Sequence, residues 1–324
     1  MDISQQQNLS DVKVSVVMCT YNGAQFLKEQ LDSILKQTYS ICELIIQDDS
    51  STDDTWEIVQ HYAASYPIIR AIRNEQNIGF NRNFKEAMLK AKGDFVAIAD
   101  QDDIWYPQKI EKQVQQIGEH DLCFSAYHRD AVYSEACRQV VLPEYNLERL
   151  MFVNCIPGHS MLVRRDFLHN PAHWNEHICY DWWFLVCAHF EKGIVCVSEP
   201  LNWHRPHAAS AIAALHRKYA RRGTAKPTYH PYLYGLYDLH ELHKKTAWNV
   251  FYQMLWEKSK GTQFALVHQL CECLLQHKTL RLCGLCMKHK NLIYPNKSGN
   301  DLKSRIRGFF YPLIYAYNNT NFEM

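Results

Sequence analysis

The first third of the chain alternates short apolar runs with stretches of helical periodicity. Apolar runs cover residues 14–19, 44–47, 68–72 and 95–99, and each has the length of a buried strand. Between the first two runs, apolar side chains recur at the spacing of one helix face over 26–35. Strands that alternate with helices form a parallel sheet with right-handed crossovers. The pattern therefore predicts an α/β fold.

After residue 105 the alternation becomes irregular, and the pattern predicts a mixed sheet followed by helices. The predicted elements are a helix from Pro107, strands over 122–127 and 160–163, a helix over 180–190, a strand over 194–197 and a polar loop over 200–210. From Leu215 onward the sequence favours helices joined by loops.

Polar residues follow three of the predicted parallel strands. The first strand runs into Thr20-Tyr21-Asn22, the second ends at Asp48-Asp49 and the fourth at Asp100-Gln101-Asp102-Asp103. The carboxyl ends of parallel strands meet at one sheet edge, where α/β proteins bind ligands. Carboxylates this close repel one another unless a cation compensates, and hard oxygen ligands suit Mg²⁺ or Mn²⁺. The sequence thus indicates a divalent ion on a nucleoside diphosphate, although an isolated acidic cluster is also typical of a solvated turn before a helix.

Two helix starts have the spacing of a capping box. Asn22 precedes Gln25 by three residues, and Asp54 precedes Glu57 by three. The first of these would place a positive helix end and free loop N–H groups beside the first strand, which favours phosphate binding there. For Asp48, capping of the turn is the alternative to a binding role.

Composition and charge narrow the class of protein. The chain has 324 residues, 47% of them hydrophobic, which is enough for one large domain or a domain with an appendage. Residues 211–324 hold 17 Lys and Arg against 6 Asp and Glu, although the whole chain has a formal charge of only +1. Neither G-x-G-x-x-G nor G-x-x-x-x-G-K-[ST] occurs, which disfavours dinucleotide enzymes and P-loop NTPases.

Two further features favour a cytoplasmic protein. No apolar stretch approaches the roughly 20 residues that span a bilayer, and the first twelve residues form no signal core. The 12 cysteines lie mostly in apolar segments, as expected in a reducing compartment without disulfides. A zinc site at Cys283-x-x-Cys286 is disfavoured, because the neighbouring Cys and His residues are irregularly spaced in a helical segment.

Four ordered motifs resemble the inverting glycosyltransferases of family 2, which have the GT-A fold. They are residues 14–23 (VSVVMCTYNG), 43–53 (ELIIQDDSSTD), 77–83 (NIGFNRN) and 100–105 (DQDDIW). The family pattern continues through 158–161, 180–183, 199–201 and 204–207, so the resemblance covers about residues 13–212. It implies a nucleotide-diphospho-sugar transferase domain, a Rossmann-like mixed sheet flanked by helices, between a tail over 1–12 and a basic, mainly helical region over 213–324. DQDDIW is similar to the rhamnosyltransferase-like branch.

The resemblance also implies roles for individual residues. The residues implied to bind the donor nucleotide are Thr20, Tyr21, Asn22, Asp49, Asn77, Arg82 and Asp100, and those implied to bind its diphosphate are Arg205 and His207. The implied metal ligands are Asp102, Asp103 and His207. His159, Trp182 and Trp183 are implied to contact the acceptor or the sugar, and Asp181 is the implied general base.

Several of these residues have a structural alternative. Asp181 lies between apolar residues, a setting that favours a raised pKa, but it also suits a helix N-cap. The tryptophans suit a helix core as well as a sugar wall. Asn77 suits a turn, and residues 204–207 suit an ordinary surface loop. Trp203-His204 replaces a Tyr-containing family pattern, so the role of His204 is open.

The implied reaction is transfer of one sugar with inversion, from a nucleoside diphosphate to a hydroxyl of a lipid-linked or growing surface polysaccharide. The expected donor is dTDP-rhamnose, followed by a UDP-hexose or UDP-N-acetylhexosamine, and the cofactor is Mg²⁺ or Mn²⁺. Two rivals stay open. A nucleotidyltransferase would need a Gly-rich loop with Arg and Lys, which residues 20–25 lack. A non-catalytic saccharide- or membrane-binding module on the same fold is the other.

The basic last third bears on the partner. Basic residues cluster at 217–222, and the segment 303–315 is cationic and rich in aromatic residues. This composition suits peripheral contact with the anionic inner face of the plasma membrane, and it suits a solvated basic helix face equally well. No nucleic-acid-binding module accompanies the charge, so nucleic acid is disfavoured as a partner.

Overall fold

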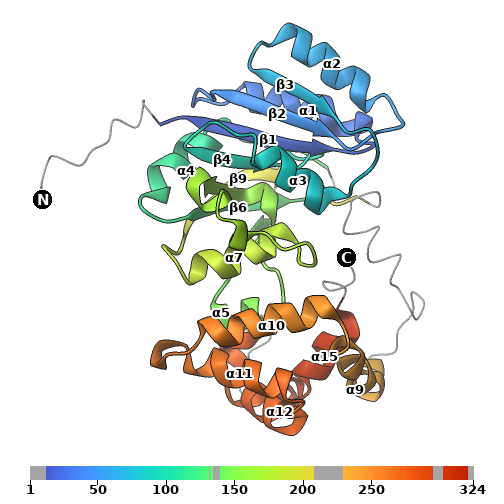
Figure 1. Cartoon of the computed structure of the whole chain (residues 1–324), viewed down its shortest axis with the longest axis vertical. Helices are drawn as coiled ribbons and strands as arrows, with labels where there is room; N and C mark the ends of the chain where they lie inside the picture. Colours follow the sequence, from blue (N-terminus) through green and yellow to red (C-terminus); the bar gives the residue numbers. More distant parts are fainter. Residues whose placement is uncertain (1–11, 131, 134–138, 208–228, 295–301, 320–324) are drawn as a thin grey trace, which may run out of the picture. The chain divides into compact units, whose positions relative to one another are not determined.

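The computed structural model describes residues 12–130, 132–133, 139–207, 229–294 and 302–319 (Figure 1). The chain forms two compact units. The N-terminal unit comprises Met1–Pro143, Ile156–Glu176 and Tyr180–His207, and the C-terminal unit comprises Glu144–Cys155, His177–Cys179 and Ala208–Met324. The domain boundary predicted at residue 212 lies outside the described residues, as do the predicted tail up to residue 11 and the basic cluster at 217–222.

Within the described residues, nine strands form one sheet in the order β3-β2-β1-β4-β8-β6-β9-β5, with β7 paired to β6. Their bounds are β1 (Val14–Thr20), β2 (Glu43–Asp48), β3 (Ile69–Arg73), β4 (Phe95–Ala99), β5 (Ile104–Trp105), β6 (Leu122–Arg129), β7 (Val140–Val141), β8 (Met161–Arg164) and β9 (Ile194–His204). The first four are parallel, which confirms the prediction from the alternating pattern. Antiparallel β8 follows on β4 and makes the sheet mixed.

Strand β9 is longer than the sequence predicts. Residues 200–204, predicted as part of a polar loop, continue the strand, because Trp203 pairs with Ile104 of β5 and with His128 of β6. The loop prediction was therefore wrong over these residues. The extension brings Trp203 and His204 next to the segment that follows β4, which positions the site described below.

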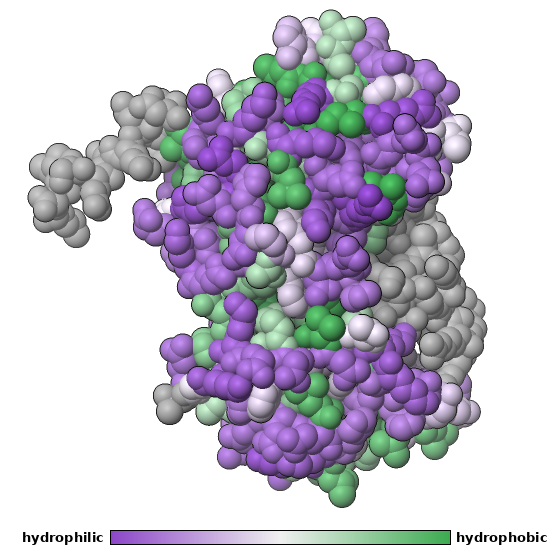
Figure 2. Space-filling view, in the orientation of Figure 1, coloured by the Kyte–Doolittle hydropathy of each residue, from purple (hydrophilic) through white to green (hydrophobic). Residues whose placement is uncertain are grey.

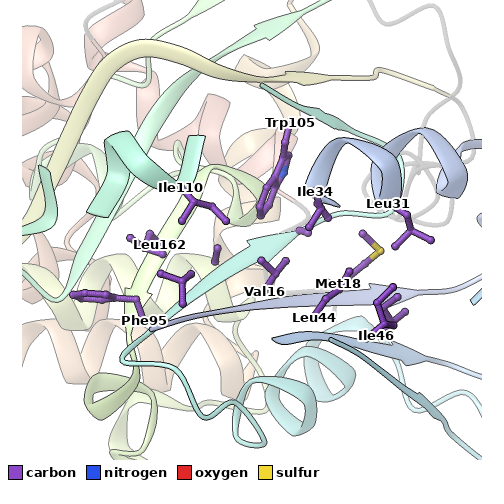
Figure 3. Close-up of a cluster of buried hydrophobic side chains, with 14 of the residues drawn as sticks. Val16, Met18, Leu31, Ile34, Leu44, Ile46, Phe95, Trp105, Ile110 and Leu162 are labelled. Carbon is purple, nitrogen blue, oxygen red and sulfur yellow. The ribbon is translucent and has the colours of Figure 1, made fainter. Parts of the chain in front are cut away.

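Helices cover both faces of this sheet (Figure 1). They are α1 (Ala24–Leu35), α2 (Thr55–Ser65), α3 (Phe80–Met88), α4 (Lys109–Ile117), α6 (Arg165–Leu168) and α7 (Tyr180–His189). On one face, Val16 and Met18 of β1 pack in a cluster with Leu31 of α1 and Ile110 of α4 (Figure 3). Val17, which alternation directs to the opposite face, is also fully buried. Strands buried on both faces read as continuous apolar runs, which is why they were predictable.

The C-terminal unit is helical in its described part, as predicted. Its helices are α5 (Leu147–Leu150), α9 (His230–Leu242), α10 (Thr246–Lys258), α11 (Ala265–Leu275), α12 (Thr279–Lys288), α13 (Lys290–Ile293), α14 (Leu302–Phe309) and α15 (Tyr311–Asn318). The buried Tyr252 of α10 donates its hydroxyl to the carbonyl of Met151 at 2.6 Å and lies 3.0 Å from the hydroxyl of Tyr315. Among the described residues, no helix is long and apolar enough to cross a bilayer.

Gly93 marks a close approach between the start of β4 and the start of β1. A Cβ there would lie 2.5 Å from the backbone N of Ser15 and 2.8 Å from the backbone O of Lys13. We predict that Gly93→Ala lowers the free energy of unfolding by about 1–3 kcal/mol, because backbone atoms must shift to make room. Urea unfolding measures the change. Gly261→Ala, where a Cβ meets nothing within 4 Å, is the control, and equal effects of the two substitutions would refute the packing argument.

Candidate active site

The acidic turn after β4, Asp100 to Asp103, lies at the carboxyl end of the parallel strands. Burial raises the pKa of Asp100, and the carboxylates of Asp103, Asp102 and Asp181 raise it further. Asp181 comes from the first turn of α7, far along the sequence. The structure therefore brings the predicted base and the predicted metal ligands into one cluster of carboxylates, which favours a cation or a proton.

Asp102 is held by the segment that follows β9. Its Oδ2 lies 2.5 Å from Nε2 of His207, and its backbone carbonyl accepts a hydrogen bond from Nε of Arg205 at 3.2 Å. The Arg205 guanidinium stacks over Phe26, 4.5 Å from the ring centroid, and forms an ion pair with Glu29. The predicted partners Asp102 and His207 thus converge. A phosphate contact by Arg205 requires its ion pair with Glu29 to open.

Asp103 does not share the partner of Asp102, His207, but belongs to a separate buried network of hydrogen bonds. Its Oδ1 lies 3.0 Å from Nδ1 of His204, and its Oδ2 lies 3.3 Å from both Nδ2 of Asn202 and Nδ1 of His159. The two imidazole rings stack, with centroids 4.8 Å apart. The sequence placed His159 at the acceptor, but it is only 2% exposed and lies in this network. The open question about His204 is answered by its hydrogen bond to Asp103.

The protonation of this network follows from burial and from Asp103. Burial alone lowers the pKa of His204, but the hydrogen bond and the negative charge of Asp103 outweigh it and raise the pKa. Burial and the positive charge of His204 lower the pKa of His159. Burial raises the pKa of Asp103, and the hydrogen bond from His204 opposes that rise. Asp103 and His204 therefore compensate each other, while His159 stays neutral.

Two donor sets could hold a divalent ion. Asp102 and His207 offer a carboxylate oxygen and an imidazole nitrogen that already meet at 2.5 Å. Asp103, His159 and His204 offer three ligand atoms that lie within 4.8 Å of one another. Carboxylate oxygen suits Mg²⁺ and Mn²⁺, and imidazole suits several divalent metals. Both sets therefore fit a divalent ion, but the Asp103 side chain is 0% exposed and already paired with His204, whereas the Asp102 side chain keeps 12% exposure.

Three backbone N–H groups at the N-terminus of α1 are already engaged. The backbone N–H groups of Asn22, Gly23 and Ala24 donate to the side chains of Ser51, Thr55 and Asp53. A phosphate at this helix end would have to compete with these three side chains, and its binding there stays a prediction. Asp54 is the N-cap of α2, as predicted, but it makes no side-chain cap hydrogen bond, so its predicted capping box is not formed. The N-cap of α1 is Gly23 and not Asn22, so the other predicted capping box was wrong.

Of the residues predicted to bind the donor nucleotide, some are exposed and others already hydrogen-bond within the protein. Thr20 is 1% exposed and donates to Asp48, whose carboxylate also accepts from the backbone N–H of Ser51. Asp48 therefore holds the turn, as its structural alternative proposed. Asn22 accepts from the backbone N–H of Thr52, whereas the side chain of Tyr21 is 47% exposed. Within this loop, Tyr21 is the residue with the large exposed side chain.

Asp49 organises the loop before α3. Its carboxylate accepts from the backbone N–H groups of Ile78 and Gly79, and Asp49 is 2% exposed. Asn77 accepts from the backbone N–H of Gly79, which is the turn anticipated as its alternative. Arg82 pairs with Glu86 one helical turn away, with 68% of its side chain exposed. The Asp49 carboxylate could contact the base of the donor nucleotide only while it also accepts these backbone hydrogen bonds.

Two residues of the site were missed by the sequence analysis. Gln101 clamps the backbone of Tyr21: its Oε1 accepts from the Tyr21 N–H at 2.9 Å and its Nε2 donates to the carbonyl at 3.1 Å. Burial raises the pKa of the Cys19 thiol, and the nearby charges of Asp49 and Asp100 raise it further. Side chains alternate along β1, so Cys19 and Thr20 point to opposite faces of the sheet. This alternation was the sequence signal that could have identified Cys19.

Asp181 is oriented by two backbone N–H groups. Its Oδ1 accepts from the N–H of Trp182 at 2.8 Å and its Oδ2 from the N–H of Gly158 at 3.3 Å. The adjacent Trp182 is 0% exposed, and Trp183 is 5% exposed with its indole N–H bonded to the carbonyl of Ala172. The predicted sugar wall is therefore not formed by these rings, because burial leaves no face of either indole open. Both belong to the core, as their alternative stated.

Comparisons with known proteins agree with this geometry. Residues 15–169 match the family Glycosyl transferase family 2. The structure of Staphylococcus aureus TarS residues 1–349 in complex with UDP-GlcNAc superposes with a TM-score of 0.56 at 16% identity, over 93% of this chain and 90% of that one. A mixed sheet of this order with helices on both faces is the GT-A fold of glycosyltransferases. Over residues 15–169 the chain is thus similar to glycosyl transferase family 2, and its fold is GT-A.

Two curated relatives match the chain in sequence. An uncharacterized protein of Mycobacterium tuberculosis is 30% identical over 205 residues, which are 60% of this chain and 59% of that protein. The UDP-Glc:alpha-D-GlcNAc-diphosphoundecaprenol beta-1,3-glucosyltransferase WfgD of Escherichia coli is 29% identical over 164 residues, which are 50% of this chain and 64% of WfgD. The chain thus spans about three fifths of the length of these relatives.

Lys109, at the start of α4, is a buried amine beside this site. It is 0% exposed, its Nζ has no hydrogen-bond partner among the described residues, and it lies 5.0 Å from the Trp105 ring centroid. Burial lowers its pKa from 10.5 to about 7. Between these two values the unfolded chain binds more protons than the folded chain, so folding becomes more favourable as the pH rises.

We therefore predict that the free energy of unfolding of the wild type rises from pH 7 to pH 10 relative to that of Lys109→Met, with a slope of up to about 1.4 kcal/mol per pH unit. Urea unfolding at several pH values measures this difference. Lys112→Met, on the same helix but with an ion pair to Glu199, is the control. Parallel pH profiles for the wild type and Lys109→Met would show that the lysine is not held neutral by burial.

Proposed function

We propose that this protein transfers a sugar from a nucleoside diphosphate to a hydroxyl of a saccharide acceptor, with inversion. The observation that carries the proposal is the convergence of Asp102 and His207 with Asp181 around Asp100. One side of such a site can hold a diphosphate through a cation, and the other side can accept a proton. The match of residues 15–169 to glycosyl transferase family 2 supports the same reaction class.

Asp181 is the proposed general base. It takes the proton of the acceptor hydroxyl while that oxygen attacks the anomeric carbon and the bond from that carbon to the diphosphate oxygen breaks. Its carboxylate is suited to this role because the backbone N–H groups of Trp182 and Gly158 fix its orientation. Direct displacement from the face opposite the leaving group inverts the anomeric carbon.

Asp102 and His207 are the proposed ligands of a divalent ion, Mg²⁺ or Mn²⁺. When bound, such an ion supplies positive charge to the departing diphosphate. The alternative set of Asp103, His159 and His204 is assigned a supporting role, because its hydrogen bonds hold the acidic turn against β9. Arg205 is proposed to release Glu29 and contact the diphosphate when donor binds.

The donor is proposed to lie between the first strand ends and the acidic turn. Tyr21 offers its exposed ring to the base, with Cys19, Asp49 and Asp100 beside it. Our first candidate is dTDP-rhamnose, followed by a UDP-hexose or UDP-N-acetylhexosamine. WfgD, whose name specifies UDP-Glc, and TarS, solved with UDP-GlcNAc, support the inclusion of both UDP-sugars.

The acceptor is proposed to be a lipid-linked or growing surface saccharide. The name of WfgD specifies a sugar on diphosphoundecaprenol, a lipid carrier, and WfgD shares 29% identity with half of this chain. An acceptor of this kind lies in a membrane, so the reaction is proposed to take place at the cytoplasmic membrane surface.

The donor prediction is tested with purified protein and a panel of dTDP-rhamnose, UDP-glucose, UDP-N-acetylglucosamine and GDP-mannose, with Mg²⁺ or Mn²⁺. We expect one donor to release its nucleotide slowly by hydrolysis, and we expect chelation or Asp102→Ala to lower this rate at least 100-fold, because the leaving diphosphate loses its counter-charge. Release of pyrophosphate from a nucleoside triphosphate and a sugar phosphate would instead identify a nucleotidyltransferase.

The base prediction is tested with Asp181→Asn on the donor so identified and an oligosaccharide-diphospholipid acceptor. Transfer should fall at least 100-fold, because the amide cannot take the hydroxyl proton, whereas nucleotide affinity should stay within a few fold. Asp166→Asn, at an exposed carboxylate of the same unit, is the control. Transfer at the wild-type rate in Asp181→Asn would contradict the mechanism.

A further inference from the structure

Helix α9 of the C-terminal unit is apolar on both of its faces. Its inner face packs on α15, where a Cβ on Gly235 would lie only 2.4 Å from the carbonyl oxygen of Leu313. The outer face carries what we call the outer stripe: Tyr229, Leu233, Leu236 and Tyr237, which are 57%, 64%, 56% and 59% exposed. Their spacing of four, seven and eight residues puts them on one side of the helix.

An exposed stripe of this size calls for a covering surface. The outer face of a helix on a soluble protein is ordinarily polar, and exposed apolar residues are ordinarily scattered. Figure 2 shows green, apolar side chains at the margin of the C-terminal unit where Figure 1 draws α9. The tyrosines identify the kind of surface, because an apolar ring with a polar hydroxyl suits the boundary between lipid headgroups and acyl chains.

The neighbouring helix α14 adds positive charge. Leu302 and Ile306 are 70% and 45% exposed, and the three basic residues of this helix, Lys303, Arg305 and Arg307, are exposed around them. The helix contains no acidic residue. Its end meets α9, since the ring of Phe310 lies 5.2 Å from the ring of Tyr232.

We propose that the outer stripe of α9 and the exposed residues of α14, Leu302 and Ile306 with the basic side chains on either side of them, form a docking surface for an anionic lipid bilayer. Apolar and tyrosine side chains enter the headgroup region while lysine and arginine side chains pair with lipid phosphates. Charge complementarity selects this occupant over a second copy of the chain, because the same positive face of another copy would be repelled. The docking surface would hold the protein where a lipid-linked acceptor is found, but it functions independently of the transfer reaction.

The test is co-sedimentation of the full chain with vesicles of phosphatidylcholine, with and without phosphatidylglycerol. We expect binding to the anionic vesicles that weakens as salt rises. The double variant Leu233→Gln and Leu236→Gln should lose binding at least tenfold, and so should the triple variant Lys303→Gln, Arg305→Gln and Arg307→Gln. Leu280→Gln is the matched control, because Leu280 is 81% exposed on α12 and lies outside the stripe.

Three results would overturn the proposal. They are equal binding to neutral and anionic vesicles, wild-type binding by the outer-stripe variant, and a concentration-dependent dimer in sedimentation that this variant abolishes. A thermal unfolding midpoint close to that of the wild type shows that each variant is folded. Nucleotide release without vesicles separates this inference from the proposed function: the docking variants should keep it, whereas Asp181→Asn should still bind vesicles.

Discussion

Repulsion among carboxylates at the end of β4 is the constraint on which the rest of this structure depends. Asp100, Asp102 and Asp103 are consecutive but for one residue, and Asp181 joins them from α7. Two of these carboxylates have different histidine partners. His204 pairs with Asp103 within the buried network, and His207, in the segment after β9, pairs with Asp102. Asp100 retains a raised pKa, so the site as a whole favours positive charge.

The loops around this cluster are fixed by hydrogen bonds that bridge distant segments. Gln101 of the acidic turn clamps Tyr21, Asp53 caps the start of α1, and Asp49 holds the turn before α3. These contacts tie the ends of β1, β2 and β4 into one rigid rim. A binding site for a flexible diphosphate gains from such a rim, because its groups need not be ordered again when the ligand binds.

The parallel half of the sheet was predictable because strands buried on both faces leave continuous apolar runs in the sequence. The acidic turn was predictable for a similar reason, since its charges follow such a run directly. The predictions that were wrong concern residues whose structure depends on contacts with distant parts of the sequence. Asn22 has the spacing of a capping residue, yet Asp53 and Thr55 cap that helix from another loop. Residues 200–204 looked like a polar loop because their pairing with β5 is invisible locally. His159 was placed at the acceptor because nothing near it in sequence reveals Asp103.

We propose that the acidic turn holds a divalent ion through Asp102 and His207, while Asp103, His159 and His204 support the turn. Calorimetric titration of Mn²⁺ into the protein with a saturating nucleoside diphosphate tests it most directly. We expect one ion per chain, with binding lost in Asp102→Asn and kept in His159→Gln. Absence of Mn²⁺ binding to the wild type, or loss in His159→Gln with retention in Asp102→Asn, would contradict it.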